Sequence, residues 1–306
     1  MNSAETKTFK IGVDGGATKT ELILVDGTGA VIARQTAPGS NPSLIGPDRA
    51  RAVLRDALRS LVAGIPPGRI DRLLLCMAGS QSFWEETAAE LGEFGRAEAF
   101  SDSLPVLELA TGGAPGLVVH AGTGSFVAAR APDGSIHYAG GLGWRFGDPG
   151  SGHDLGSRGL AQSLLEHQGW AERSALGAAL AEEAGTTDYV VLSRLFYSAP
   201  DADARIAAFA PWVVELAARG CQPAQRIIAE SVAGFAPLVH AVLQRLFPET
   251  VADAPVAGGI SGALLNRPPC LEALRALAAV HAWPVRWRPV TDPPIEGVRR
   301  MLQRSP

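Results

Sequence analysis

Residues 11–32 read IGVDGGATKTELILVDGTGAVI, in which apolar runs alternate with glycine-rich turns. The apolar run from Phe9 to Asp14 predicts a strand, and a second strand resumes at Glu21 to Val25 after a loop of glycine and threonine. Asp26 to Gly29 supplies a turn before a third strand over residues 30–34. The segment is therefore a predicted β-meander with a glycine-rich loop at its first turn.

The same pattern occurs a second time. Residues 117–138 read LVVHAGTGSFVAARAPDGSIHY, again a strand, a glycine and threonine loop, a strand, an Asp-Gly turn and a strand. The repeat predicts two similar lobes that each present a glycine-rich hairpin, and two such hairpins facing each other across a cleft would hold the two ends of a polyphosphate. The competing interpretation is a chance likeness between two common hairpins.

Helices and strands alternate after the first hairpin. Apolar residues recur at helical spacing over residues 48–62, and we predict a strand over 73–77, a helix over 84–91 and a strand over 97–100. This alternation predicts an α/β fold whose mixed sheet is covered on both faces. The second half is richer in helix. Its predicted helices cover residues 153–168, 172–184, 188–197, 204–219, 224–246 and 270–281, before a strand over 285–288 and a short terminal helix.

Length and composition exclude several classes of protein. The 306 residues leave room for two domains of about 150 residues each. Lys and Arg number 27 and Asp and Glu number 31, so the formal net charge of −4 gives no basic footprint for nucleic acid or an anionic membrane. The N-terminus is polar, and no uncharged apolar stretch of about 18 residues offers a membrane span. We expect a cytoplasmic protein.

Cysteine usage agrees with a reducing compartment. The three cysteines, Cys76, Cys221 and Cys270, lie far apart and include no CxxC pair. They therefore predict neither a disulfide framework nor a cluster of cysteine metal ligands.

The first glycine loop is suited to binding phosphate. Its residues Gly15, Gly16, Thr18 and Lys19 follow a strand, where backbone N–H groups reach phosphate oxygens because no Cβ blocks the approach to glycine. The loop is not a Walker A motif, because Thr18 replaces the glycine before the lysine, and no GxGxxG motif indicates a Rossmann site. The competing interpretation is a plain tight hairpin.

Two acidic residues lie at predicted strand ends. Asp14 ends the first strand beside the glycine loop, where a carboxylate can hold hydrated Mg²⁺ next to the phosphates. Its alternative role is a cap of the turn. Asp102 follows the strand over residues 97–100 and precedes a helix, where a carboxylate can accept a proton from an attacking hydroxyl. Its alternative role is that of an N-cap.

Two loops of the second lobe carry candidate ligand contacts. The GTG motif at residues 122–124 offers backbone donors and a hydroxyl, with a plain β-turn as the alternative. Residues 140–156, GGLGWRFGDPGSGHDLG, form a loop too long and too rich in glycine for a simple connection. Trp144, Asp148 and Ser151 are its candidate contacts.

A last glycine pair lies near the end of the chain. Residues 255–262, PVAGGISG, predict a strand, then a glycine turn, then a helix. Gly258 and Gly259 would let a flat base lie against the backbone, and a turn that packs the helix is the alternative.

These motifs together resemble the actin-like ATPase and sugar-kinase superfamily, and within it the branch that contains N-acetylglucosamine kinases and the BadF/BadG/BcrA/BcrD ATPase family. The resemblance covers nearly the whole chain. It rests on the order of GVDGGATKT at residues 12–20, SDS at 101–103, AGTGS at 121–125, GWRFGDPGSG at 143–152 and AGGISG at 257–262.

The resemblance implies two ribonuclease-H-like (actin-like ATPase) domains of α/β fold around a nucleotide cleft. The N-terminal domain is expected over residues 1–116 plus 290–306, with the terminal helix returning to pack on it. The C-terminal domain is expected over residues 117–289, with a helical insertion.

The resemblance also implies roles for the residues that match its motifs. Asp14, Gly15, Gly16, Thr18 and Lys19 match the first phosphate motif, and Gly122, Thr123 and Gly124 match the second. Gly258 and Gly259 match the adenosine motif, Asp102 matches the catalytic base, and Asn41, Gly143, Asp148 and Ser151 fall on the sugar-binding loops. Asp14 is the expected ligand of Mg²⁺, through water. Two positions depart from the family pattern: Ala78 replaces a sugar-contacting serine, and Pro149 turns GDEGSG into GDPGSG.

The implied reaction is transfer of the γ-phosphoryl group of ATP, with Mg²⁺, to the C6 hydroxyl of a small amino sugar, N-acetylglucosamine. Glucosamine and N-acetylmuramic acid stay open as substrates. An ATPase activator of a radical dehydratase is a further alternative, but it holds an iron–sulfur cluster through cysteines near the second-lobe motifs, and the three cysteines do not fit that placement. A DNA-binding repressor is disfavoured by the negative charge and the few residues before the first loop. A homodimer stays an open possibility.

Overall fold

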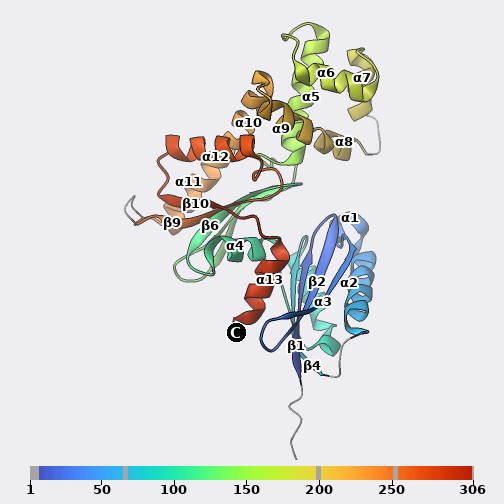
Figure 1. The fold of residues 1–306 in the computed structure, drawn as a ribbon, viewed down its shortest axis with the longest axis vertical. Helices are drawn as coiled ribbons and strands as arrows, with labels where there is room; N and C mark the ends of the chain where they lie inside the picture. The colour runs from blue at the N-terminus through green and yellow to red at the C-terminus, as the bar shows by residue number, and fades with distance from the viewer. Residues whose placement is uncertain (1–6, 65–67, 198–200, 251–253, 305–306) are drawn as a thin grey trace, which may run out of the picture. The chain divides into compact units, whose positions relative to one another are not determined.

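The structure is a computed structural model that describes residues 7–64, 68–197, 201–250 and 254–304. The chain divides into two compact units (Figure 1). Unit 1 comprises Met1–Gly113 and Asp292–Pro306, and unit 2 comprises Ala114–Thr291.

Unit 1 is built on a five-stranded mixed sheet with the strand order β3-β2-β1-β4-β5. The pairs β1–β2 and β2–β3 are antiparallel, so the predicted meander is confirmed, and β4 and β5 continue the sheet parallel to β1. The strands are β1 (Thr8–Gly15), β2 (Lys19–Asp26), β3 (Val31–Pro38), β4 (Arg69–Met77) and β5 (Arg96–Ser101).

Helices cover both faces of this sheet because apolar side chains leave it on both sides. On one face, α2 (Pro47–Val62) and α3 (Gln81–Ala89) enclose a core that includes Val13 and Leu75. On the other face, α13 (Pro294–Gln303) packs on the strands through Ile295, Val298 and Leu302. Figure 1 shows this last helix, in red, beside the blue strands of the N-terminal segment. Each such buried apolar side chain contributes roughly 1.5–3 kcal/mol.

A glycine permits the close approach of α13 to the sheet. A Cβ on Gly12 would lie 2.7 Å from Cγ1 of Val298, which is closer than real Cβ atoms come to a neighbour. The C-terminal segment is also held by charge, because the buried carboxylate of Glu108 binds Arg304 at 2.7 Å. Glu108 belongs to α4 (Ser103–Thr111), which packs against α13. The short helices of unit 1 are α1 (Pro42–Ile45) and η1 (Gly92–Phe94).

Unit 2 repeats the sheet of unit 1. Its strand order is β10-β9-β6-β7-β8, in which β6, β7 and β8 form an antiparallel meander and β9 and β10 run parallel to β6. The five strands therefore correspond one to one with those of unit 1, and the repeat predicted from the sequence is confirmed. The strands are β6 (Gly116–Ala121), β7 (Ser125–Arg130), β8 (Ile136–Gly140), β9 (Val256–Ser261) and β10 (Val285–Pro289).

The long chain segment between β8 and β9 is helical. Its helices are α5 (Gly152–Gln168), α6 (Ala175–Ala184), α7 (Tyr189–Tyr197), α8 (Ala202–Ala208), α9 (Ala210–Ala218), α10 (Gln222–Ala233) and α11 (Phe235–Leu246), and α12 (Pro268–Val280) follows β9. Figure 1 shows α5 to α9 gathered together beyond the sheet. Their buried side chains and one face of the sheet form a single core.

Two helices predicted as continuous are each two helices. The stretch 204–219 divides at Phe209, because Pro211 occupies the first turn of α9 and lacks a backbone N–H. The stretch 224–246 divides at Gly234, where a Cβ would lie 2.6 Å from the Cβ of Pro149. Residues 222–246 are also long and apolar enough, by composition, to cross a membrane. In unit 2 this stretch packs into the core through Ile228, Phe235 and Val239, among others.

Candidate functional site

Four loops meet at the carboxyl edge of the unit 1 sheet. Ser40 after β3 donates its N–H to the carbonyl of Gly16 at 3.1 Å, and Ala78 after β4 donates to the carbonyl of Gly15 at 2.7 Å. Asp102 after β5 donates its N–H to Met77 at 3.3 Å. The backbone itself therefore brings the first glycine loop and the predicted base to one edge of the sheet.

The first glycine loop presents backbone donors to solvent. Gly16 closes the turn through its N–H to the carbonyl of Lys19 at 2.9 Å. The exposed amides of Ala17 and Thr18 have no acceptor within the described residues. Gly39 lets the neighbouring loop pass close by, because a Cβ there would clash with the carbonyl of Ala17. Two adjacent unpaired amides in a tight turn form a cradle suited to an anion.

Lys19 forms an ion pair that the sequence did not reveal. Its Nζ lies 2.8 Å from Oε2 of Glu21, and the lysine side chain is 58% exposed. Glu21 is the cross-strand partner of Asp14, so the two carboxylates share one face of the sheet. The predicted phosphate-binding lysine is thus held by a carboxylate of its own strand.

Asp14 lies in a surplus of negative charge. Burial, together with the neighbouring charges of Asp102 and Glu21, raises the pKa of Asp14 to about 7 against the opposing effect of Lys19. A divalent cation relieves such crowding, and carboxylate oxygens are the ligands that Mg²⁺ prefers. Asp14 by itself is therefore suited to a hydrated Mg²⁺, while the described residues contain no group of three or more His, Cys, Asp or Glu side chains that could hold a metal ion directly.

Asp102 occupies an N-cap position without acting as a cap. It precedes α4, yet its side chain makes no capping hydrogen bond. The hydroxyl of Ser101 donates to its Oδ1 at 3.3 Å. Burial raises the pKa of Asp102, and hydrogen bonds from Ser101 and from nearby backbone amides oppose that rise. The side chain is a half-buried carboxylate at a strand end, and its raised pKa makes it more basic than an ordinary aspartate.

Asn41 lies beside the loop that follows β4. Its Oδ1 accepts the N–H of Ser43 at 3.0 Å and so caps α1. A Cβ on Gly79 would approach the same oxygen at 3.0 Å. The predicted sugar ligand is therefore at the same sheet edge as the first glycine loop, with its oxygen used by a helix and its amide nitrogen as the remaining donor.

The second glycine loop, at residues 122–124, contacts the loop that carries Asp148. The N–H of Gly122 binds the carbonyl of Gly124 at 2.9 Å, and the N–H of Gly152 binds the carbonyl of Gly122 at 2.9 Å. A Cβ on Gly124 would lie 3.0 Å from Oδ2 of Asp148. The glycine loop at residues 122–124 and the loop that carries Asp148 are therefore in direct contact, although they are separated in sequence.

The Asp148 carboxylate is buried and partly unsatisfied. It is 6% exposed, and burial raises its pKa while the backbone amides of Ser125 and Gly143 oppose the rise. Its Oδ1 has no hydrogen-bond partner within the described residues. A buried oxygen without a partner costs free energy, so an exchangeable donor such as a sugar hydroxyl fits this position.

Ser151 has a structural role in this loop. It is fully buried, and its Oγ accepts the N–H of Asp154 at 3.2 Å as the N-cap of α5. Trp144, in the same loop, is 41% exposed and stacks on His153 with ring centroids 4.5 Å apart. Arg145 lies over the Trp144 ring at 4.9 Å. An accessible aromatic surface thus lies in the loop that carries Asp148.

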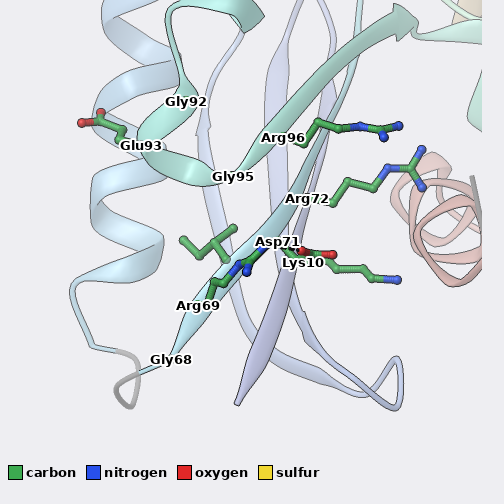
Figure 2. A pocket seen from close by; sticks show the side chains of 10 residues that line it. Lys10, Gly68, Arg69, Asp71, Arg72, Gly92, Glu93, Gly95 and Arg96 are labelled. Atoms are coloured by element: carbon green, nitrogen blue, oxygen red, sulfur yellow. Dashed lines mark hydrogen bonds and ion pairs between the residues drawn. The ribbon is translucent and has the colours of Figure 1, made fainter. Parts of the chain in front are cut away.

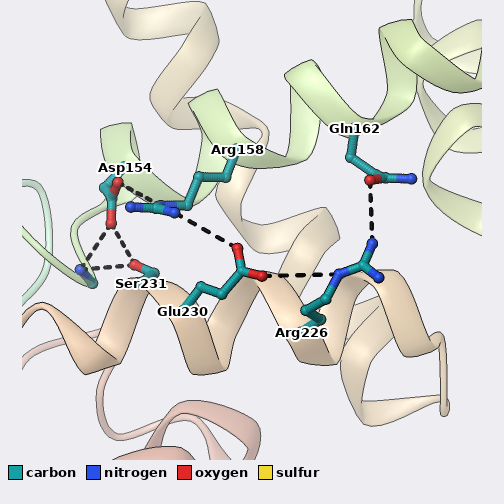
Figure 3. A network of polar contacts seen from close by, with 7 residues as sticks. Asp154, Arg158, Gln162, Arg226, Glu230 and Ser231 are labelled. Atoms are coloured by element: carbon teal, nitrogen blue, oxygen red, sulfur yellow. Dashed lines mark hydrogen bonds and ion pairs between the residues drawn. The ribbon is translucent and has the colours of Figure 1, made fainter. Parts of the chain in front are cut away.

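A polar network fixes the second half of that loop (Figure 3). Gly150 donates its N–H to Oγ of Ser231 at 2.9 Å, and Ser231 donates to Oδ2 of Asp154 at 2.5 Å. Arg158 binds the other oxygen of Asp154 at 2.8 Å and extends the network to Glu230. The loop is therefore bound to both α5 and α10, and no local pattern of residues predicts this arrangement.

The glycine turn predicted at residues 258–261 is wrong. Gly258 and Gly259 are buried inside β9, where Gly258 pairs with Leu117 on one side and Trp287 on the other. The turn lies at Gly262, whose φ of +101° and whose close approach to the carbonyl of Ala121 both require glycine. Gly258 serves packing, since a Cβ there would clash with Val285.

A cavity of about 710 Å³ lies elsewhere in unit 1 (Figure 2). Lys10, Arg72 and Arg96 line it from one lateral row of β1, β4 and β5. Glu98 binds both arginines, at 2.7 and 2.9 Å, and Lys10 donates to the carbonyl of Leu302 at 2.9 Å. The row precedes Asp14 by four residues of β1, so it is separate from the carboxyl-edge loops.

Known proteins share this architecture and sequence. An N-acetyl-D-glucosamine kinase of Dictyostelium discoideum is 25% identical over 258 residues, which is 79% of this chain and 81% of that protein. An N-acetylmuramic acid/N-acetylglucosamine kinase of Clostridium acetobutylicum is 25% identical over 55% of this chain and 57% of that protein. A crystal structure from Chromobacterium violaceum, provisionally named an N-acetylglucosamine kinase, matches with a TM-score of 0.73 and 26% identity over 97% of this chain and 99% of that one.

The architecture is the two-domain α/β fold of actin-like ATPases and sugar kinases, as the sequence motifs implied. The model of one ATPase family matches residues 11–275, which span both glycine loops, Asp102 and the Asp148 loop. The chain belongs to the BadF/BadG/BcrA/BcrD ATPase family.

Proposed function

We propose that this protein is an ATP-dependent kinase that phosphorylates the C6 hydroxyl of N-acetylglucosamine. The observation that carries the proposal is the edge of the unit 1 sheet, where an anion cradle and the carboxylates of Asp14 and the half-buried Asp102 lie together. The names of the relatives support the choice of substrate, since both curated relatives are kinases of N-acetylated amino sugars.

In this proposal the first glycine loop binds phosphate. The amides of Ala17 and Thr18 donate to phosphate oxygens, and Lys19 leaves Glu21 to neutralise part of their charge. Asp14 would hold Mg²⁺ through water. The cation, when bound, neutralises charge that develops on the phosphoryl oxygens and the leaving group.

Asp102 is the proposed catalytic base. Its carboxylate orients the C6 hydroxyl and accepts its proton as the sugar oxygen bonds to the γ-phosphorus. The bond from that phosphorus to the bridging oxygen breaks, and ADP leaves. Burial raises the basicity of Asp102, and the absence of a capping bond leaves the carboxylate available for the substrate.

Unit 2 supplies further proposed contacts. The unsatisfied Oδ1 of Asp148 accepts a sugar hydroxyl, and the exposed Trp144 offers an apolar surface to the sugar ring. The backbone at residues 122–124 binds ATP phosphates, as the family motif implies. We place the adenosine contact at the sharp turn of Gly262, because Gly258 and Gly259 are buried inside β9.

The substrate is tested by measuring ADP release with Mg·ATP against glucose, glucosamine, N-acetylglucosamine and N-acetylmuramic acid. We expect the highest kcat/KM with N-acetylglucosamine, and phosphorus–proton NMR of the product to place the phosphate on C6. A preference for N-acetylmuramic acid would favour the second candidate, which the Clostridium acetobutylicum relative suggests. No sugar-stimulated release with any of the four would contradict a sugar kinase.

Other properties belong to the same proposal. A cytoplasmic location suits an enzyme that uses ATP and whose cysteines Cys76 and Cys270 are buried free thiols. A homodimer is proposed as its assembly, and light scattering of the purified protein tests it.

A further inference from the structure

The two hairpins correspond strand by strand, and the loop of unit 1 is one residue longer than that of unit 2. In unit 1, Asp14 lies two residues before Gly16, which closes the loop, and pairs with Glu21 and Cys76 on the neighbouring strands. In unit 2, His120 lies two residues before the loop-closing Gly122. The structural repeat therefore places an imidazole where unit 1 has its metal-suited carboxylate.

The contacts of His120 follow the same register. Its strand partners are Phe126 on β7 and Ser261 on β9. The imidazole stacks on Phe126 with ring centroids 4.8 Å apart and planes 12° apart, and its Nδ1 lies 3.3 Å from Oγ of Ser261. One ring nitrogen is thus engaged, and the stack fixes the orientation of the ring.

The second ring nitrogen faces the glycine loop. A Cβ on Gly122 would lie 3.7 Å from Nε2 of His120, so this nitrogen lies beside the first residue of the loop. Nε2 has no hydrogen-bond partner in the part of the chain that the structure describes. Thr123 and Gly124, next along the loop, also have backbone N–H groups without an acceptor there.

We propose that His120 is a phosphate-binding residue of the second hairpin, with Nε2–H donating a hydrogen bond to a phosphate oxygen of ATP. The inference rests on the proposed function and adds a residue that no family motif covers. In this assignment the hydroxyl of Ser261, 3.3 Å from Nδ1, donates to that nitrogen, and the proton of the neutral ring lies on Nε2. Burial lowers the pKa of His120 to about 4, so the ring binds phosphate as a neutral donor.

This assignment gives the two hairpins different tasks. The carboxylate of Asp14 in the first hairpin would attract a cation. A carboxylate at position 120 would repel phosphate, whereas a neutral imidazole there supplies a hydrogen-bond donor without a formal charge. The first hairpin is thus suited to a cation, and the second is suited to an anion.

Two amide variants separate this role from packing. The side-chain nitrogen of glutamine reaches the position of Nε2, whereas that of asparagine reaches only the position of Nδ1. In the full-length protein, calorimetric titration with ATP, ADP and AMP is expected to show about tenfold weaker ATP binding in His120→Asn and His120→Ala, the cost of one hydrogen bond to a charged group. His120→Gln is expected to stay within about threefold of wild type, and the KM for the sugar is expected to stay unchanged in all three.

The controls distinguish the phosphate contact from a general loss of structure. His137→Gln makes the same change at a half-buried histidine of β8, whose ring contacts Ser135, and is expected to bind ATP as wild type does. Binding of AMP is expected to change less than binding of ATP in His120→Asn. If neither His120→Asn nor His120→Ala folds, Ser261→Ala is the alternative variant. It keeps the imidazole but removes the hydroxyl that holds the ring proton on Nε2, and it is expected to weaken ATP binding about threefold.

Three results would overturn the assignment. They are ATP binding by folded His120→Asn as tight as wild type, equal losses for ATP and AMP, and His120→Gln as weak as His120→Ala. Failure of the proposed function has a different signature: wild type binds ATP, the His120 series ranks as expected, and no sugar stimulates ADP release. A wild-type protein that binds no ATP would overturn both.

Discussion

Asp14 and Asp102 end two strands that both pair with β4, so a single strand separates the two carboxylates at one edge of the sheet. Strands two positions apart are about 10 Å from each other, which leaves room for a phosphoryl group and its acceptor between the proposed metal ligand, Asp14, and the proposed base, Asp102. Burial raises the pKa of both carboxyl groups, and the charge of Asp102 adds to the effect on Asp14.

Removing the base tests that geometry directly. Asp102→Asn is expected to lower kcat by about 10²–10⁴, the range for loss of general base catalysis, because the amide orients the hydroxyl but takes no proton. ATP binding, measured by calorimetry, is expected to stay within about twofold of wild type. Unchanged turnover in a folded Asp102→Asn protein would remove the residue from its proposed role.

Much of this edge follows from local sequence. The first loop, Asp14 and Asp102 are predictable because each lies where a strand ends, and strand ends are marked by short-range patterns of apolar residues and glycine. Glu21 is different: a single glutamate in a strand indicates a solvent-facing position. Its role depends on the cross-strand register that sets it opposite Asp14.

The errors have the same origin in long-range packing. Gly258 and Gly259 suggest a turn, but pairing with β6 and β10 on both sides keeps the backbone extended. The break between α10 and α11 lies at Gly234 because Pro149, 85 residues earlier in the chain, contacts it there. Neither of these long-range contacts can be predicted from the local pattern of residues.

The raised pKa of Asp14 predicts how stability depends on pH without Mg²⁺. The native state keeps this proton up to about pH 7, whereas the unfolded chain loses it near 3.8. Between these values the native state binds more protons, so its free energy of unfolding falls as pH rises, by at most about 4 kcal/mol for this group. Urea denaturation in EDTA at pH 5 and pH 8 measures the fall.

Asp14→Asn is the matched variant for that measurement. It cannot ionise, so its stability is expected to exceed that of wild type at pH 8 and to change less between pH 5 and pH 8. The same variant is expected to lose most of its phosphoryl transfer, since the ligand for Mg²⁺ is gone. The raised pKa would be contradicted if the free energy of unfolding of the wild type increased from pH 5 to pH 8 and that of Asp14→Asn did not.

The pair formed by Lys19 and Glu21 predicts opposite results for two single changes. Lys19→Met removes the cation, and the KM for ATP is expected to rise about threefold to tenfold through loss of one charged contact to phosphate. Glu21→Gln breaks the same pair but frees the lysine, so the KM is expected to stay equal or fall. Steady-state kinetics at fixed sugar give both values, and a similar rise in the two variants would indicate that the ion pair matters only for structure.

The network behind the Asp148 loop predicts an effect on sugar binding alone. Ser231→Ala removes the acceptor of the Gly150 N–H and a donor to Asp154. The Gly150 amide keeps only its longer contact to Oδ2 of Asp154 at 3.3 Å, and we expect this loss of about 1 kcal/mol to loosen the loop that presents Asp148 and Trp144. We expect the KM for the sugar to rise about fivefold, with the KM for ATP unchanged, because Gly122 and Gly124 close their own turn.

Arg226→Gln, at the far end of the same network, is the control, since its contacts to Glu230 and Gln162 are long and exposed. If Ser231→Ala alters the KM for ATP as much as the KM for the sugar, the two loops of unit 2 act as one element rather than as separate binding surfaces.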